Sequence, residues 1–269
     1  SQLNHPRQDF DLAQKDLPDD FQNQIGDEQF FDHMGVAAHP YNPHRPLTSR
    51  PNNSLIERNK VTGFRDIDFD VMEVMNGSQD HMPDRVAATR KDWLSLVAQG
   101  IKLSASANSD SHNKWQQVAL PRNMVRVPDD RLEAFDINLL TSAIRDGEFY
   151  GTTGPFMEVS LDTTPIGGTY KGEKATLTGR IYSAAWARAE RLTVQVNGQD
   201  TDHLELDETG RFSVALDFTK DSFVTIEAEG NPGEIYKAVY PGFFPYAYSN
   251  PIYVDADSDG IWAPPGLPE

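Results

Sequence analysis

Hydrophobic and polar positions follow two different patterns along this chain, and the pattern changes near residue 155. In the first part, short apolar runs alternate with stretches whose apolar residues recur every three or four positions, which predicts strands alternating with helices. The predicted elements are a strand at 70–77, a helix at 83–100, and strands at 101–108 and near 123–128, followed by a helix at about 128–147. This order predicts βα units that build a parallel sheet or barrel, so the fold class of this part is α/β.

After residue 155, apolar residues alternate with polar ones over strand lengths. The predicted strands are 157–161, 175–181, 192–196, 212–216 and 223–227. Turn signals such as Asn197-Gly198 separate them. We therefore expect an all-β module at 156–247, an immunoglobulin-like β-sandwich. The predicted organisation is a partial βα barrel at 1–155, the sandwich, and a tail at 248–269 that returns to the barrel.

The chain is strongly acidic, with 41 Asp and Glu against 24 Lys and Arg and a formal net charge of −17. Such a surface repels phosphate backbones and anionic headgroups, so we expect no nucleic acid and no anionic membrane as a partner. No stretch reaches the roughly 20 apolar residues of a membrane helix, so we expect no membrane span. The chain has no cysteine, which leaves His, Asp and Glu as the strong metal ligands.

The chain starts at Ser1 without an initiator methionine, a basic segment or an apolar leader segment, and we expect it to be the interior of a longer protein. The acidity, the lack of cysteine and the predicted sandwich favour an exported protein, periplasmic or extracellular. The sequence carries no signal for an oligomeric state.

Asp110 and His112 form the first candidate site, because a predicted strand leads into them. On extended backbone, positions i and i+2 point to the same side, so these two side chains can converge on a divalent metal or form a general-base pair. The plain alternative is a turn aspartate beside a surface histidine.

Two residues elsewhere in the first part strengthen this candidate. Glu73 lies within an apolar run, where a carboxylate requires a metal, an arginine or hydrogen-bond donors, and a structural salt bridge is the plain alternative. His5 precedes Pro6, which keeps the histidine extended where a loop begins. Because strand ends and their following loops share one face of a βα barrel, both residues are expected near Asp110 and His112.

A second candidate lies near the end of the chain, where Asp255, Asp257 and Asp259 alternate ahead of Gly260. This spacing matches the first half of a calcium-binding loop. Position 12 of such a loop would be Gly266 instead of the bidentate glutamate, which excludes a complete EF-hand. A single calcium ion held by this turn and a plain acidic turn are the two interpretations.

Five motifs in order resemble the polymerase and histidinol phosphatase (PHP) metallohydrolases, in particular their carbaryl-hydrolase-like CehA/McbA branch. The motifs are residues 3–7 (LNHPR), 68–77 (DFDVMEVMNG), 108–112 (NSDSH), 143–156 (AIRDGEFYGTTGPF) and 249–255 (SNPIYVD). The resemblance implies a distorted (β/α)7 barrel with two or three metal ions held by His, Asp and Glu. It also implies hydrolysis of phosphoesters or, in this branch, of carbamate-type esters.

The resemblance also implies roles for individual residues. His5, Asp110 and His112 resemble metal ligands, and Glu73 resembles an acidic residue that is a ligand or lies behind the ligands. Arg7 and Asn76 would neighbour the site and contact the substrate, and the guanidinium of Arg7 suits an anionic group.

The chain departs from the PHP pattern in one respect, because it contains no His-x-His pair. We expect the N-terminal half of the barrel to be absent and the remaining ligands to bind metal weakly, so that the fragment itself is inactive. The leading hypothesis is the C-terminal portion of a zinc-, manganese- or iron-dependent hydrolase of a small-molecule ester or phosphoester. The alternative is a non-catalytic extracellular binding module with a calcium-stabilised β-sandwich.

Overall fold

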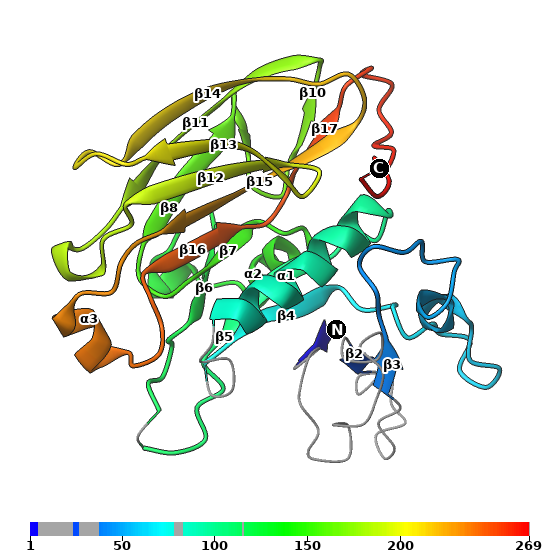
Figure 1. Ribbon diagram of the computed structural model, residues 1–269, viewed down its shortest axis with the longest axis horizontal. Coiled ribbons are helices and arrows are strands. Elements are labelled where there is room, and N and C mark those ends of the chain that lie inside the picture. Colours follow the sequence, from blue (N-terminus) through cyan, green and yellow to red (C-terminus); the bar gives the residue numbers. More distant parts are fainter. Residues whose placement is uncertain (5–23, 27–37, 78–82, 115, 269) are drawn as a thin grey trace.

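The structure is a computed structural model that describes residues 1–4, 24–26, 38–77, 83–114 and 116–268 of the 269-residue chain. Within these residues, a small parallel sheet, helix α1, a large sheet and a four-stranded sheet follow one another as layers (Figure 1). The two larger sheets form a β-sandwich, so the predicted all-β module is confirmed at the level of architecture.

The small parallel sheet has the order β1-β4-β5. β1 (Gln2–Leu3) and β5 (Ser104–Asn108) flank β4 (Val71–Asn76), and all six residues of β4 are buried. α1 (Pro83–Ala98) connects β4 to β5, as its apolar spacing predicts. A closed barrel is not seen in the part of the chain that the structure describes, where β5 is an edge strand of this sheet.

The large sheet has eight strands, and the smaller one has four. The large sheet consists of β6 (Arg122–Val125), β7 (Phe149–Thr152), β10 (Thr169–Lys171), β12 (Arg191–Val196), β13 (Gln199–Glu205), β15 (Ser222–Glu229), β16 (Tyr246–Ser249) and β17 (Ile252–Asp255). The smaller sheet consists of β8 (Phe156–Leu161), β9 (Thr164–Pro165), β11 (Lys174–Tyr182) and β14 (Arg211–Asp217). The predicted turn Asn197-Gly198 joins β12 to β13, with both residues at positive φ, as a tight hairpin requires.

The remaining elements are short. They are β2 (Gln24–Gly26), β3 (Ala38–Pro40), α2 (Ile137–Arg145), α3 (Glu234–Val239) and 3₁₀ turns at Asn52–Ile56, Leu132–Ala134 and Ala185–Ala187.

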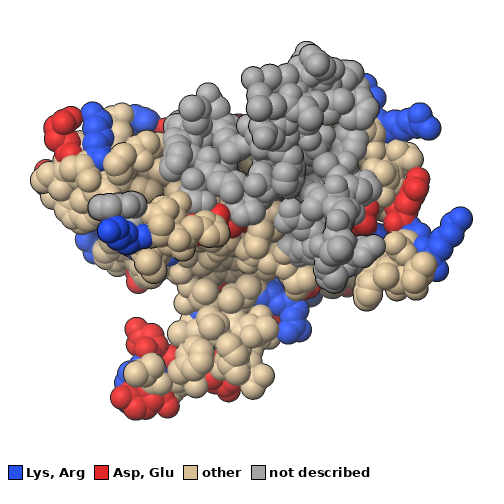
Figure 2. All heavy atoms as spheres, turned by 90° about the horizontal axis from the view of Figure 1, so that it is seen from below, with Lys and Arg blue, Asp and Glu red and all other residues tan. Residues whose placement is uncertain are grey.

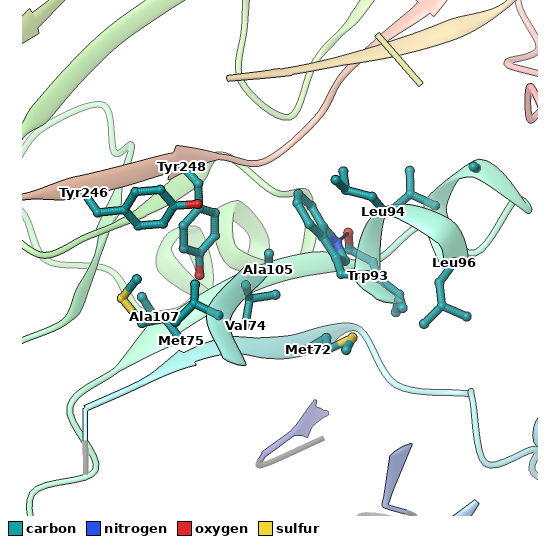
Figure 3. Close-up of a cluster of buried hydrophobic side chains, with 14 of the residues drawn as sticks. Met72, Val74, Met75, Trp93, Leu94, Leu96, Ala105, Ala107, Tyr246 and Tyr248 are labelled. Carbon is teal, nitrogen blue, oxygen red and sulfur yellow. Dashed lines mark hydrogen bonds between the residues drawn. The ribbon is translucent and has the colours of Figure 1, made fainter. Parts of the chain in front are cut away.

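The large sheet is apolar on both faces because alternate residues of its strands pack into two different hydrophobic cores. In β16, Ala247 packs in the core between the two sandwich sheets, whereas Tyr246 and Tyr248 pack in the core that contains α1. In Figure 3, these tyrosines lie above the strands β4 and β5, and Trp93 projects from α1 into the same layer. α1 is therefore buried between two sheets, which joins the α/β part to the sandwich.

The sandwich extends beyond the predicted range 156–247. β6 and β7 enter the large sheet from before this range and β17 from after it, because β7 pairs with β16 and β15 pairs with β17. The predicted tail therefore begins as sheet strands. Its later residues contact α1, where the Gly266 amide donates to the Ala98 carbonyl oxygen at 2.9 Å.

The helix predicted at 128–147 is shorter than expected. Regular helix covers only Ile137–Arg145, with Asp136 accepting a capping hydrogen bond from the Asn138 amide. The expected apolar stripe was Leu132, Phe135, Leu139, Leu140 and Ile144. Leu132 is 85% exposed, Phe135 62% and Leu139 50%, so three of these five apolar side chains do not pack in a core. The predicted pattern included Leu132–Ala134, which forms a separate 3₁₀ turn before the helix begins.

Side-chain amides cover the open edge of β5. The Asn123 amide accepts from the Ala107 N–H at 2.8 Å and donates to the Ala107 carbonyl oxygen at 3.0 Å. The Asn250 amide accepts from the Ala105 N–H at 2.6 Å and donates to the carbonyl oxygens of Ala105 and Phe149. Both asparagines belong to the large sheet or its connections, so they take the place of a neighbouring strand and satisfy the buried backbone.

We expect Asn250→Ala to lower the free energy of unfolding by about 2–3 kcal/mol, because buried backbone groups of Ala105 and Phe149 lose their partners. Asn138→Ala is the matched control, since Asn138 is exposed and its loss should change the free energy by less than about 0.5 kcal/mol. Urea unfolding curves of both variants measure the difference. Equal stabilities would contradict the role assigned to Asn250.

Charged side chains of both signs lie on the described part of the face shown in Figure 2. On the face in Figure 2, the Lys and Arg side chains of the described residues lie among Asp and Glu side chains instead of forming one continuous basic patch. No helix among the described residues combines the length and the apolar content that crossing a bilayer requires.

Candidate functional site

The carboxyl ends of β4 and β5 meet at one edge of the parallel sheet. The two strands pair in parallel, with Asn76 opposite Asn108 at their last positions. The loop that follows β5 carries Asp110 and His112, so their side chains reach the same edge. In open parallel sheets, this edge is where ligands bind.

Glu73 is a buried carboxylate held by two amides. It is 3% exposed, and its Oε1 accepts from Asn108 Nδ2 at 2.7 Å while its Oε2 accepts from Asn76 Nδ2 at 3.2 Å. Residues three apart on a regular strand face opposite sides, but the register of β4 shifts between Glu73 and Met75. This irregularity turns Asn76 to the side of Glu73.

Asp110 stands between Asn76 and His112. Its Oδ1 lies 2.7 Å from His112 Nε2, and its Oδ2 accepts from Asn76 Nδ2 at 3.2 Å. The Asp110 side chain is 19% exposed and the His112 side chain 70% exposed, so the pair opens to solvent on the histidine side. The two side chains meet, but not by extended backbone as expected, because Asp110 has a positive φ of 44°.

The loop after Asp110 is fixed by its own hydrogen bonds. The His112 amide donates to Gln116 Oε1 at 2.6 Å, and Ser111 Oγ donates to the Gln117 carbonyl oxygen at 2.8 Å. The imidazole is therefore carried on an ordered turn, although it is exposed.

The structure adds three residues that were not predicted for this site: Asn108, Asn123 and Tyr248. Asn123 Nδ2 donates to Asn108 Oδ1 at 3.2 Å, and this orients the amide that holds Glu73. The Tyr248 hydroxyl donates to the Ser106 carbonyl oxygen at 2.7 Å. Burial, and then the nearby carboxylate of Glu73, raises the pKa of Tyr248 well above its ordinary value, so this hydroxyl stays protonated at neutral pH. Only Asn108 carried a signal, because it lies within the motif 108–112.

The predicted site residues fall into three groups. His5 and Arg7 lie outside the described residues. Asp110 and His112 lie together, with Glu73 behind them. Asn76 was expected to contact a substrate, but it is 0% exposed and donates to both carboxylates, so its place is to orient Asp110.

Asp110 and His112 fit a metal ion by the chemistry of their donors. Zinc binds imidazole nitrogen and carboxylate oxygen at about 2.0–2.2 Å, and both kinds of donor are present here. At 2.7 Å the two atoms are at hydrogen-bond distance from each other, so they would have to move apart to admit an ion. The Asn76 amide behind Asp110 is the kind of support that orients a ligating carboxylate. Glu73 is buried and is linked to Asp110 through the Asn76 amide, which donates to both carboxylates.

The acidic turn near the end of the chain is organised differently from its sequence pattern. Asp255 and Asp257 lie with Asp221, and one carboxylate oxygen of each lies within 4.8 Å of the others. Asp259 is not in this group, and its Oδ1 accepts from the Ile261 amide at 2.7 Å.

The comparisons with known proteins identify no family for this chain. No family model matches the chain, and no curated protein matches it. Among solved structures, the chain is similar to the crystal structure of an engineered protein, with 12% sequence identity and a TM-score of 0.24. The match covers 70% of this chain, and the chain spans half the length of that protein.

Proposed function

We propose that this chain carries part of the metal site of a PHP-type hydrolase that acts on a phosphoester or a related small-molecule ester. Asp110 and His112 would be two of the metal ligands, and Asn76 the residue that positions Asp110. The observation that carries the proposal is the contact of Asp110 with His112 on one side and with Asn76 on the other, at the carboxyl edge of a parallel sheet.

The surroundings of the pair support this assignment. The order β1-β4-β5 with α1 between β4 and β5 is the arrangement that a βα barrel would have locally, and β1 ends two residues before His5. Three asparagines (Asn76, Asn108 and Asn123) hold the two carboxylates and one another. Such a network fixes a ligating carboxylate before the ion arrives.

Each residue of the site would have its own role. Asp110 and His112 hold zinc, manganese or iron, which when bound supplies a Lewis acid and lowers the pKa of water. Asn76 keeps the Asp110 carboxylate directed at His112, and Glu73 holds the Asn76 amide from behind. The exposed side of His112 is where a small ester would approach.

The first test is the metal content of the Asp110→Ala variant. We expect the wild-type chain to bind Zn²⁺ or Mn²⁺ in equilibrium dialysis, weakly because part of the ligand set is missing, and Asp110→Ala to bind one ion fewer, because a ligating oxygen is gone. Asp130→Asn is the matched control, since Asp130 is an exposed carboxylate away from this edge. Elemental analysis measures the bound metal, and circular dichroism verifies that the variants are folded.

The same metal analysis can contradict the proposal. Equal metal content in the wild type and in Asp110→Ala would show that Asp110 holds no metal and would leave the pair as a carboxylate–imidazole contact alone. Asn76→Ala refines the test, since loss of an orienting partner should weaken metal affinity about 10- to 100-fold without abolishing binding.

A further inference from the structure

The second acidic group, Asp221, Asp255 and Asp257, lies where two strands of the large sheet meet. Asp255 ends β17, and Asp221 comes directly before β15. The antiparallel pairing of these strands sets Ser222 opposite Val254, which brings Asp221 beside Asp255 although they are far apart in sequence. Asp257 follows in the loop after β17, and one carboxylate oxygen of each residue lies within 4.8 Å of the others.

Asp255 is the residue that makes this group unusual. It is 1% exposed, and its Oδ2 accepts from the Gly260 amide at 2.9 Å and lies 3.7 Å from Lys171 Nζ. Its Oδ1 is buried without a hydrogen-bond partner. A buried carboxylate oxygen without a partner is costly, and the Asp255 carboxylate has two further carboxylates beside it.

The other two carboxylates are held in place by backbone amides. Asp221 Oδ1 accepts from the Ala256 amide at 2.8 Å and Asp221 Oδ2 from the Ala263 amide at 2.7 Å. Asp257 Oδ1 accepts from the Asp259 amide at 3.2 Å. Each carboxylate oxygen has more than one acceptor site, so these bonds orient the group and leave sites for a cation.

The charge balance of the group favours a divalent ion. Three carboxylates face one nearby amine, Lys171, whose side chain is 57% exposed. An all-oxygen donor set suits Ca²⁺, Mg²⁺ or Mn²⁺ rather than a metal that prefers nitrogen or sulfur. Calcium binds oxygens at about 2.3–2.6 Å, so its ligands on opposite sides lie up to about 5 Å apart, which spans this group.

We propose that Asp221, Asp255 and Asp257 bind a calcium ion that fixes the loop after β17 to the start of β15. The ion would supply the missing partner of Asp255 Oδ1, and backbone carbonyl oxygens or water would complete its shell. The site also secures the end of the chain, because the segment that it anchors continues to Trp262, whose Nε1 donates to the Ser222 carbonyl oxygen at 2.7 Å. This inference is independent of the proposed hydrolase site.

The test is thermal unfolding of the wild-type chain with increasing CaCl₂. We expect a saturable rise in the melting temperature that EGTA reverses, with a Kd of about 10⁻⁴–10⁻³ M, in the range of weak calcium sites. MgCl₂ should have a smaller effect, because Mg²⁺ demands a stricter geometry and releases water reluctantly. Limited proteolysis of the C-terminal residues should slow when calcium is added.

Substitutions test whether calcium binds to the group that meets in space, which includes Asp221, or to the alternating aspartates of the sequence, which include Asp259. Asp257→Asn should weaken calcium binding about tenfold or more, because Asp257 is a ligand in the group and asparagine keeps its acceptor for the Asp259 amide. Asp259→Asn is the matched control in the same loop and should leave the affinity within about twofold. Lys171→Met should strengthen binding, because it removes the cation that competes for Asp255.

Two results would overturn the inference. The first is a melting temperature of the wild type that does not respond to calcium, which would mean that Lys171 alone balances Asp255. The second is loss of the response in Asp259→Asn together with its retention in Asp257→Asn, which would place the ion in a different set of ligands.

Discussion

Replacing Trp93 by alanine should lower the free energy of unfolding by about 3–5 kcal/mol. Trp93 is 0% exposed, and its ring lies 6.5 Å from that of Tyr248, in the layer between the parallel sheet and the large sheet (Figure 3). Its Nε1 donates to the Leu103 carbonyl oxygen at 2.9 Å. The variant therefore leaves a large cavity and an unpaired carbonyl where the two parts of the protein meet.

Two further variants of Trp residues make this measurement specific. Trp93→Phe keeps most of the ring and should cost about half as much, because the hydrogen bond to Leu103 is lost but the layer remains filled. Trp186→Ala removes a tryptophan that is 42% exposed and should cost less than Trp93→Ala. Guanidinium unfolding gives all three values, and a loss below about 1 kcal/mol for Trp93→Ala would refute the packing described for α1.

Replacing Arg90 by leucine should lower the free energy of unfolding by about 3 kcal/mol. Arg90 projects from α1, is 5% exposed, forms an ion pair with Glu227 of β15 and donates to Gln195 Oε1 of β12. Burial lowers the pKa of the Arg90 guanidinium below its ordinary value. Breaking a buried ion pair costs about 3–5 kcal/mol, and we expect the lower end because the Glu227 side chain is 20% exposed.

The double variant Arg90→Leu/Glu227→Leu is the informative comparison. Removal of both charges leaves no uncompensated carboxylate, so the double variant should be more stable than Arg90→Leu alone. If the double variant were less stable than the single one, the cost of Arg90→Leu would come from lost packing of its aliphatic stem instead of from the charge on Glu227.

Local patterns predicted the elements of this fold better than their partners. β4, α1, the hairpin turn at Asn197 and the three longer strands of the smaller sheet (β8, β11 and β14) follow from periodicity and turn residues. β17 and the second half of β16 were assigned to a tail, because a four-residue run shows no preference for a sheet until its pairing with β15 and β7 is known. The start of the helix predicted at 128–147 was placed too early for the same reason. The spacing of apolar residues does not show which surface they pack against.

In the candidate sites, too, residues close in sequence could be predicted, whereas residues brought together by strand pairing could not. The Asp110-x-His112 pair could be predicted because its two members lie only two positions apart in the sequence. The orienting role of Asn76 was not visible, because it depends on the irregularity between Glu73 and Met75. Asp221 could not be assigned to the acidic turn, since only the register of β15 against β17 brings it beside Asp255.

The amides of Asn123 and Asn250 have a consequence for association between molecules. An exposed edge strand offers free N–H and C=O groups that can template a strand from another chain, which leads to aggregation or domain swapping. On β5, the amide groups of Ala105 and Ala107 that would serve this purpose are already occupied. An incoming strand would have to displace the buried Asn250 and the half-buried Asn123 before gaining its first hydrogen bond, so this side of the parallel sheet is protected against intermolecular pairing.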